Sequence, residues 1–327
     1  MKAILINYDK SLRWDNVPDP IIKDDEVLVK IEAAGINRAD LLQREGGYPP
    51  PPGCPEWMGL EIAGEIIEMG KEAKKASAWK LGDKVCALLG GGGYAEYVAV
   101  KHDMLMPIPQ NCSMAEAAGI PEAFATSYLN LFIEGKIKEG DTLLVTGGNS
   151  GLASVMIPMA RAFGIRTITT VRNEEKAQKI AHLGADRVVI TYKEDLSLVL
   201  KEELDAGHGV DVAIDCLGGE IMGKYLHYLN RGARWIMIAS LAGNLTEIDL
   251  KNIYVRNVRI IGSTLRSRAP EVKAEILSSI VREIYPKIES GEIKPTICAT
   301  FPIENAADAQ DMLYKSQSAG KIILTVG

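Results

Sequence analysis

The sequence has no excess of positive charge and no long hydrophobic segment. It has 37 Lys and Arg residues and 43 Asp and Glu residues, which gives a net charge of −6 at pH 7. This balance provides no electrostatic reason to bind nucleic acid or an anionic membrane. No apolar run approaches the roughly 20 residues that span a bilayer, and the apolar start, residues 1–6, is too short for a signal peptide. We therefore expect a cytoplasmic protein with no nucleic-acid or membrane partner.

Cysteine and histidine are also scarce. The five cysteines include no closely spaced pair, and their odd number argues against a disulfide framework, so reduced thiols are expected. The four histidines, His102, His182, His208 and His227, are scattered along the chain. The sequence thus shows no Ser/His/Asp or Cys/His arrangement of the kind used in nucleophilic catalysis.

The length of 327 residues predicts two domains, because one hydrophobic core rarely grows beyond about 250–300 residues. Residues 1 to about 119 look rich in β-structure, with strands expected at 27–31, 62–67 and 94–100 between Gly, Pro and Asp residues. The glycine run 90–93 is predicted to be a flexible hairpin connection, since no helix follows it.

From about residue 120, strands and helices alternate. Such alternation predicts an α/β fold with a doubly wound parallel sheet that is covered on both faces. The expected strands are residues 142–146, 167–171, 187–191, 210–215, 234–239 and 259–262, with helices at 152–163 and 174–182. Beyond Gly262 a long helix is expected over 270–290 and a strand over 321–326, and periodicity alone does not decide where this tail packs.

A glycine-rich turn lies between an expected strand and an amphipathic helix, with the sequence Gly147-Gly148-Asn149-Ser150-Gly151-Leu152-Ala153. Small residues in such a turn let the backbone approach phosphates, and the helix N-terminus offers free N–H groups. The turn therefore predicts the pyrophosphate site of a dinucleotide. Pro158 lies inside the following helix and removes a hydrogen-bond donor, so a kink or an irregular first half is expected there.

The end of the next strand predicts which nicotinamide cofactor is bound. An Asp or Glu about 20 residues after the turn usually holds the ribose 2′-hydroxyl of NAD. This sequence has Arg172 there, with Lys176 one helical turn later, and the two cations predict a grip on the 2′-phosphate of NADPH. Solvated surface charge is the alternative for this pair. Glu174 and Glu175 lie between them and are interpreted as acids of the first helical turn.

Further motifs are spread over the whole chain. They are Asn37-Arg38-Ala39-Asp40-Leu41, Gly59-Leu60-Glu61-Ile62-Ala63-Gly64, Pro121-Glu122-Ala123, Asp215-Cys216-Leu217-Gly218-Gly219, Leu265-Arg266-Ser267-Arg268 and Gly320-Lys321-Ile322-Ile323-Leu324. Together with the turn at 147–153, they resemble the zinc-free quinone oxidoreductases of the medium-chain dehydrogenase/reductase superfamily.

The resemblance implies a GroES-like catalytic domain, residues 1–121 and 264–327, around an inserted Rossmann NADP-binding domain, residues 122–263. It also implies a homodimer, often joined through edge strands of the nucleotide domains. Relatives in the zinc branch bind a catalytic metal with Cys, a His-Glu pair and a further Cys or Asp. Here Leu60 stands where that branch has His, so no zinc is expected.

The resemblance implies functional residues as well. Asn37, Tyr48 and Thr126 are expected at the nicotinamide end, where Tyr48 would contact the substrate and Asn37 would orient the carboxamide or an acceptor oxygen. Besides the turn at 147–153, Arg172 and Lys176, the expected cofactor contacts are Tyr192, Cys216, Ile238, Leu265, Ser318 and Lys321. For Tyr192 and Leu265, ordinary packing is the alternative.

The reaction implied is the reduction of a quinone by NADPH. Without a metal nothing polarises an alcohol for oxidation, whereas a quinone is already a strong acceptor. One alternative is an NADPH-dependent reductase of enone or enoyl-thioester double bonds. Another is an NADPH-binding structural or RNA-associated protein, against which the acidic balance counts.

Overall fold

The computed structural model describes residues 1–327 and forms two compact units. Unit 1 consists of Met1–Ala125 and Arg268–Gly327, and unit 2 consists of Thr126–Ser267. The domain boundaries expected after residues 121 and 263 lie slightly earlier in the chain.

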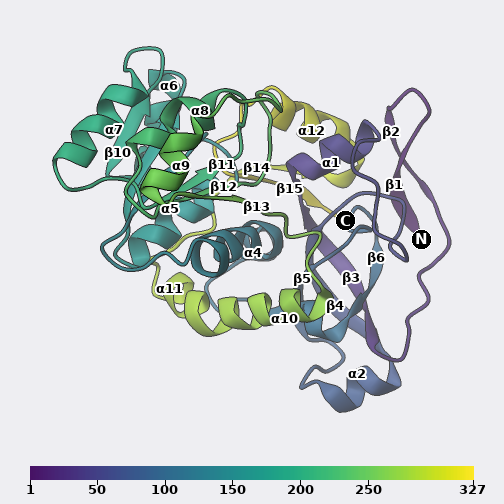
Figure 1. The fold of residues 1–327 in the computed structure, drawn as a ribbon. Helices are drawn as coiled ribbons and strands as arrows, with labels where there is room; N and C mark the ends of the chain where they lie inside the picture. The colour runs from purple at the N-terminus through teal and green to yellow at the C-terminus, as the bar shows by residue number, and fades with distance from the viewer. The chain divides into compact units, whose positions relative to one another are not determined.

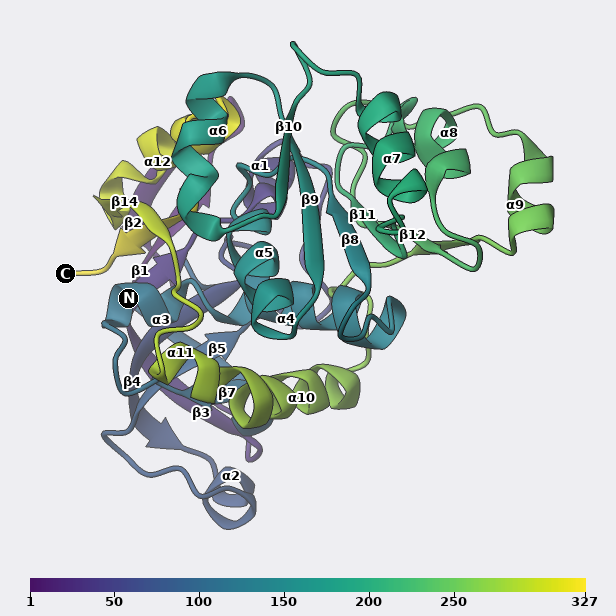
Figure 2. The same cartoon turned by 90° about the vertical axis from the view of Figure 1, so that its left-hand side faces the viewer.

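A six-stranded parallel sheet forms the centre of unit 2 (Figure 2). Its order is β10-β9-β8-β11-β12-β13, so the chain starts in the middle, extends to one edge and then extends to the other. This is the doubly wound order of dinucleotide-binding folds. The strands are β8 (Thr142–Val145), β9 (Arg166–Val171), β10 (Arg187–Ile190), β11 (Val212–Asp215), β12 (Arg234–Met237) and β13 (Arg259–Gly262). All six predicted strands are confirmed, and their ends differ by at most two residues.

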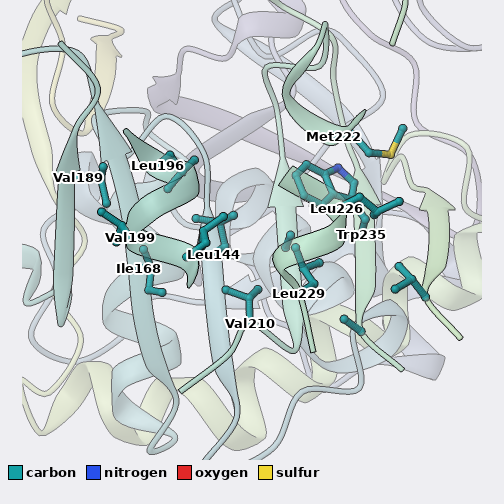
Figure 3. Packing of buried hydrophobic residues seen from close by; sticks show 14 residues of the cluster. Leu144, Ile168, Val189, Leu196, Val199, Val210, Met222, Leu226, Leu229 and Trp235 are labelled. Atoms are coloured by element: carbon teal, nitrogen blue, oxygen red, sulfur yellow. The ribbon is translucent and has the colours of Figure 1, made fainter. Parts of the chain in front are cut away.

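Helices cover both faces of this sheet. Right-handed crossovers place α5 (Ala153–Ala162) and α6 (Glu174–Ile180) on one face, and α7 (Leu196–Asp205) and α8 (Ile221–Tyr225) on the other. Buried side chains of the strands and of the covering helices form one hydrophobic cluster (Figure 3). It includes Leu144, Ile168, Val189 and Trp235 from the strands, Leu200 from α7 and Leu226 from the turn after α8. Burial on both faces explains why β8 is apolar in consecutive positions instead of alternating.

The helix that follows the glycine-rich turn is α-helical on both sides of Pro158. α5 continues as an α-helix through it, so the irregular first half expected from the sequence is wrong. The proline removes only its own N–H donor, while Val155, Met156 and Met159 around it are completely or almost completely buried. Tertiary packing of these side chains holds the helix in place.

A seven-stranded sheet forms the centre of unit 1, with the order β14-β15-β3-β4-β5-β7 and with β6 paired to β3. The C-terminal strand β15 pairs antiparallel with β3 and parallel with β14, which decides where the tail packs. A separate two-stranded sheet pairs β1 with β2. The bounds are β1 (Lys2–Ile6), β2 (Leu12–Asn16), β3 (Glu26–Gly35), β4 (Glu61–Met69), β5 (Lys84–Leu88), β6 (Tyr97–Lys101), β7 (Leu105–Pro107), β14 (Ile297–Pro302) and β15 (Lys321–Thr325).

The glycine run 90–93 is not a hairpin connection, so that prediction is wrong. It leads from β5 to β6, but β5 pairs with β4 and β7, whereas β6 pairs with β3. Gly92 donates its N–H to the carbonyl of Trp57 at 2.9 Å, and Gly93 donates to that of Gly59 at 3.1 Å. These backbone hydrogen bonds hold the buried run against a neighbouring loop.

The long C-terminal helix is interrupted. α10 (Pro270–Ser279) passes into a π-helical turn (Ile280–Ile284) and then into α11 (Tyr285–Glu289), near the bottom of Figure 1. Pro286 has no N–H to give to a regular helix, and the wider turn directly precedes it. The remaining helices are α1 (Arg38–Arg44), α2 (Lys71–Ala76), α3 (Met114–Ala118), α4 (Pro121–Tyr128), α9 (Leu250–Arg256) and α12 (Ala306–Tyr314). None of the helices has the length and apolar character needed to cross a membrane.

Candidate functional site

The carboxyl ends of the parallel strands gather most of the predicted site residues of unit 2. In an open parallel sheet, ligands bind at this edge, next to the point where the strand order reverses. The turn 147–153 follows β8, at that point. Each of the other five strands is followed by a predicted contact: Arg172 after β9, Tyr192 after β10, Cys216 after β11, Ile238 after β12 and Leu265 after β13.

The glycine-rich turn is shaped by its first two residues. Gly147 has a φ of 72°, in the left-handed region that favours glycine. At Gly148 a Cβ would overlap Oγ1 of Thr169, so only glycine lets the turn approach β9 this closely. Two hydrogen bonds to Thr170 secure the approach: Gly147 N–H donates to its Oγ1 at 3.2 Å, and Gly148 N–H donates to its carbonyl at 2.8 Å.

The second half of the turn presents the start of α5. The Ser150 hydroxyl accepts from the N–H of Ala153 at 3.1 Å, whereas the N–H groups of Gly151 and Leu152 have no acceptor within the chain. Unpaired N–H groups at a helix start, together with the helix dipole, favour a bound anion. Ala153 is completely buried, so the start of the helix has room for a methyl group but not for a large side chain. The turn therefore has the form that a pyrophosphate group requires.

Arg172 and Lys176 are neighbouring cations that make no ion pair. Of the nearby acids, Glu175 pairs with Lys179 at 2.8 Å and Glu174 pairs with Lys193. Partial burial and the positive charge of Arg172 both lower the pKa of Lys176, in that order of importance. Two neighbouring cations that repel one another are stabilised by an anion placed between them. This arrangement favours the phosphate interpretation over solvated surface charge.

Tyr192 and Leu265 differ in their surroundings. The side chain of Tyr192 is 75% exposed, so internal packing does not account for it, whereas Leu265 is buried within the protein. Ile238 is half-buried and fixed through its N–H, which donates to the carbonyl of Asp215 at 2.9 Å. Thr126, at the start of unit 2, lies in α4, and its carbonyl accepts from Asn130 at 2.7 Å.

Asp215 has a structural role that its place in the motif 215–219 did not indicate. Its completely buried carboxylate accepts from the N–H groups of Leu217 and Gly218, at 2.9 and 3.0 Å. It also accepts from the Thr146 hydroxyl at 3.1 Å and from the indole N–H of Trp235 at 3.3 Å. Asp215 thereby fixes the loop that carries Cys216, whose sulfur lies 3.2 Å from the carbonyl of Thr146. The sequence signal for this role is an acid at the end of an expected strand, in a short motif that ends with two glycines.

A buried polar cluster in unit 1 surrounds Asn37. The Lys321 ammonium donates to Asn37 Oδ1 at 2.8 Å, to the carbonyl of Ile36 at 3.0 Å and to the Glu61 carboxylate. Asn37 Nδ2 donates to Glu61 Oε1 at 2.9 Å, and the N–H of Glu122, in the first turn of α4, donates to Glu61 Oε2 at 2.9 Å. The structure thus brings the predicted residues Asn37 and Lys321 into direct contact. Glu61 joins them, a role that the sequence did not indicate.

A second acid lies beside this cluster. Asp40 is completely buried, and burial raises the pKa of its carboxyl to about 6. Hydrogen bonds oppose this effect: the N–H of Asn37 donates to Oδ2 at 2.7 Å, and the Tyr94 hydroxyl donates to the same atom at 2.9 Å. Burial and the Asp40 charge raise the pKa of Tyr94 well above its ordinary value, so Tyr94 stays a donor.

Two further predicted residues lie in unit 1. Tyr48 is half-buried in the loop after α1, and Ser318 is buried shortly before β15.

Comparison with known proteins identifies the family. The model of the alcohol dehydrogenase GroES-like domain matches residues 23–110, and that of the zinc-binding dehydrogenases matches residues 151–282. The quinone oxidoreductase of Mus musculus is 30% identical over 310 residues, which cover 93% of this chain and 90% of that protein. The chain belongs to the quinone oxidoreductase family. It is therefore an oxidoreductase of the medium-chain dehydrogenase/reductase superfamily.

Solved structures confirm the predicted fold class of this quinone oxidoreductase family member, a Rossmann sheet inserted in a GroES-like domain. The Escherichia coli quinone oxidoreductase complexed with NADPH has a TM-score of 0.85 and 25% identity, over 99% of this chain and 98% of that one. An NAD-dependent alcohol dehydrogenase has a TM-score of 0.84 and 26% identity, with both chains covered completely.

The description of one family model names zinc, but the residues present in this oxidoreductase do not fit that ion. The side chain of Leu60 has no donor atom, and the neighbouring Glu61 carboxylate is already bound by Lys321 and Asn37. Nowhere in the chain do three His, Cys, Asp or Glu side chains come together in a group that could hold a metal. Zinc sites require three or four such ligands.

Proposed function

We propose that this protein is an NADPH-dependent quinone reductase. The observation that carries the proposal is a pair of cations that make no ion pair: Arg172 directly after β9 and Lys176 in the first turn of α6. In dinucleotide-binding folds, the residues after the second strand face the 2′ position of the adenosine ribose. NADPH carries a phosphate there and NADH carries a hydroxyl. Because relatives of this fold include proteins described with either cofactor, the choice rests on the chain's own residues.

The residues of unit 2 fit the phosphates of the cofactor. The N–H groups of Gly151 and Leu152 and the dipole of α5 would hold the pyrophosphate, and Arg172 with Lys176 would hold the 2′-phosphate. Tyr192 is exposed and available to the adenosine end. In unit 1, Asn37 and Tyr48 are assigned to the nicotinamide end. When bound, NADPH supplies the reducing equivalents, and the chain itself has only to bind and orient the reactants.

A quinone is the acceptor that suits such a site. Leu60 and Glu61 do not fit a metal that could polarise an alcohol or a carbonyl, and no histidine lies in the Asn37 cluster to relay a proton. A quinone needs neither device, because its ring is already strongly electron-accepting. Holding the ring and the nicotinamide together then accounts for the rate enhancement. The relatives named as quinone oxidoreductases support this choice.

The test is NADPH consumption by the purified protein, followed by absorbance. We expect turnover with 1,2-naphthoquinone and a clear preference for NADPH over NADH. An alkenal and a crotonyl thioester serve as competing acceptors. Faster turnover of either one would replace the proposal by a double-bond reductase. Binding of NADPH with no turnover of any acceptor would indicate a binding protein instead.

The protein acts as a homodimer joined at the β13 edge of the unit 2 sheet. β13 pairs only with β12, and Arg259 and Ile260 on it are exposed, so its free backbone groups can pair with a second copy. The neighbouring helix α9 has no buried residue, and Leu250 and Tyr254, one turn apart on it, are 70% and 68% exposed. An apolar surface of this kind beside an open strand supports an interface between identical chains.

A further inference from the structure

The hydrogen bonds of Lys321 are not those expected of a residue that contacts the cofactor. Its side chain is only 4% exposed, and its ammonium donates to Ile36, Asn37 and Glu61. An ammonium group has three N–H donors and no acceptor, so the three bonds use it completely. Lys321 therefore has no donor left for a cofactor and acts on its protein neighbours.

The neighbours of Asn37 fix which way its amide points. Lys321 can only donate and an ionised Glu61 can only accept, so the amide oxygen must face Lys321 and the amide nitrogen must face Glu61. A flipped amide would place two donors together and two acceptors together. The nitrogen directs its second proton to the carbonyl of Gly35 at 3.5 Å. Asn37 is also the N-cap of α1, where its side chain faces the N–H of Asp40, but that N–H donates to the backbone carbonyl of Asn37 at 3.0 Å and makes no cap bond to the side chain. The capacity that remains on the side chain is therefore one lone pair of Oδ1.

Glu61 is held firmly enough to impose this orientation. Its second oxygen accepts from the N–H of Glu122, at the start of α4, where the helix dipole favours a negative charge. Its first oxygen packs against Gly35, where any Cβ would overlap the carboxylate. The Lys321–Glu61 ion pair and its hydrogen bonds thus connect β4 and β15 with the start of α4 and the segment before α1. Pairing also compensates the cost of burying both charges.

We infer that Lys321 and Glu61 are positioning residues that keep Asn37 a hydrogen-bond acceptor toward the nicotinamide end of the cofactor. The inference rests on the proposed function. A lone pair on Oδ1 binds a donor, such as the carboxamide NH₂ group or a ribose hydroxyl. A quinone offers only acceptor oxygens, so Asn37 orients the cofactor and not the second substrate. The resemblance leaves two roles open for Asn37, which are to orient the carboxamide or an acceptor oxygen. This arrangement favours the carboxamide.

The experiment compares NADPH affinity with stability in matched variants. Lys321→Met alone leaves the Glu61 charge buried and unpaired, so a large loss of thermal stability is expected. The double variant Lys321→Met/Glu61→Gln removes both charges and is expected to regain most of that stability. The neutral amide that it places at position 61 no longer dictates the Asn37 orientation. We expect the NADPH Kd, measured by cofactor fluorescence, to rise about five-fold, the effect of losing one ordered hydrogen bond.

A second pair of changes restores the acceptor. In Asn37→Asp/Glu61→Gln the carboxylate moves to position 37, where it accepts from Lys321 and from the new amide at position 61. The number of charges in the cluster is unchanged. We expect this variant to bind NADPH within about two-fold of the original chain, because an acceptor is again held in place. The KM for NADPH should follow the Kd in all variants, while the KM for the quinone stays the same.

The control is the exposed pair Lys101 and Asp25, 3.1 Å apart in unit 1. Lys101→Met/Asp25→Asn should leave the Kd for NADPH unchanged. A stable Lys321→Met/Glu61→Gln variant with the original Kd overturns the inference, because the pair then serves packing alone. A folded Asn37→Asp/Glu61→Gln variant that binds NADPH much more weakly than the original chain also overturns it. A parent chain that does not bind NADPH at all overturns the proposed function first.

Discussion

In the proposed function, two side chains, Arg172 and Lys176, decide the cofactor preference. The acids between them, Glu174 and Glu175, are directed to Lys193 and Lys179, which leaves the two cations for an anion. The lowered pKa of Lys176 reflects partial burial first and the repulsion between the two cations second. Binding of a phosphate would remove this repulsion and add charge-assisted hydrogen bonds.

Arg172→Ala is expected to weaken NADPH binding about ten-fold or more and to leave NADH binding nearly unchanged, because only NADPH carries the 2′-phosphate. Fluorescence titration with both cofactors measures the change. Lys201→Ala, which removes an exposed cation paired with Asp205 on α7, is the control. Equal losses for the two cofactors would show that Arg172 contacts something other than the 2′-phosphate.

Asp40 and Tyr94 give a prediction about pH. The folded-state pKa of Asp40 is raised to about 6, above the unfolded value of 3.8, so its ionisation lowers stability as the pH rises from about 4 to 6. Tyr94→Phe removes a bond that favours the ionised form. The variant should therefore lose about 1–2 kcal/mol of unfolding free energy at pH 8 and less at pH 5.

Urea unfolding at the two pH values measures this difference. Tyr314→Phe, an exposed tyrosine of unit 1, is the control and should change stability at neither pH. Losses of the same size at pH 5 and pH 8 would mean that Tyr94 acts through packing and not through the Asp40 charge.

At the scale of elements, the strand–turn–helix unit β8–α5 is built by close contact as much as by sequence pattern. Gly148 lets the turn lie against β9, and Ala153 lets the helix start lie against the sheet. Both positions exclude large side chains for steric reasons. The same contacts give the N–H groups of Gly151 and Leu152 a fixed location.

Gly148→Ala is expected to destabilise the protein by about 1–3 kcal/mol, the usual cost of overpacking, and to weaken NADPH binding because the turn is displaced. The overlap is with Thr169, so Gly148→Ala/Thr169→Ala should recover part of both losses. Gly327→Ala, where a Cβ meets open space outside the proposed interface, is the control. Thermal melts and cofactor titration are the measurements, and a stable Gly148→Ala protein with full affinity would contradict the steric argument.

At the scale of the whole molecule, the proposed homodimer would cover the open strand β13. A free strand beside exposed apolar side chains promotes uncontrolled pairing unless a specific surface covers it. A symmetric pair of copies would cover the β13 strand of each copy with that of the other.

Ile260→Lys and Tyr254→Glu are expected to shift the protein from dimer to monomer, because each places a charge in the proposed interface. Light scattering on a size-exclusion column measures the mass. Leu198→Glu, which changes an equally apolar and exposed side chain on α7, should leave the mass unchanged. A parent chain that elutes as a monomer, or variants that remain dimeric, would place the interface elsewhere or remove it.

The sequence by itself determined the strands of unit 2, the turn at 147–153 and the two cations, because these depend on local periodicity and on short spacings. It did not determine the role of Lys321, which depends on contact with Asn37 and Glu61 from distant parts of the chain. The glycine run 90–93 was misread for the same reason, since its partner strands are chosen by tertiary pairing. Pro158 was misjudged because burial outweighs one missing hydrogen bond. Local chemistry thus indicated the proposed cofactor turn, and only the tertiary structure decided which buried groups contact Asn37.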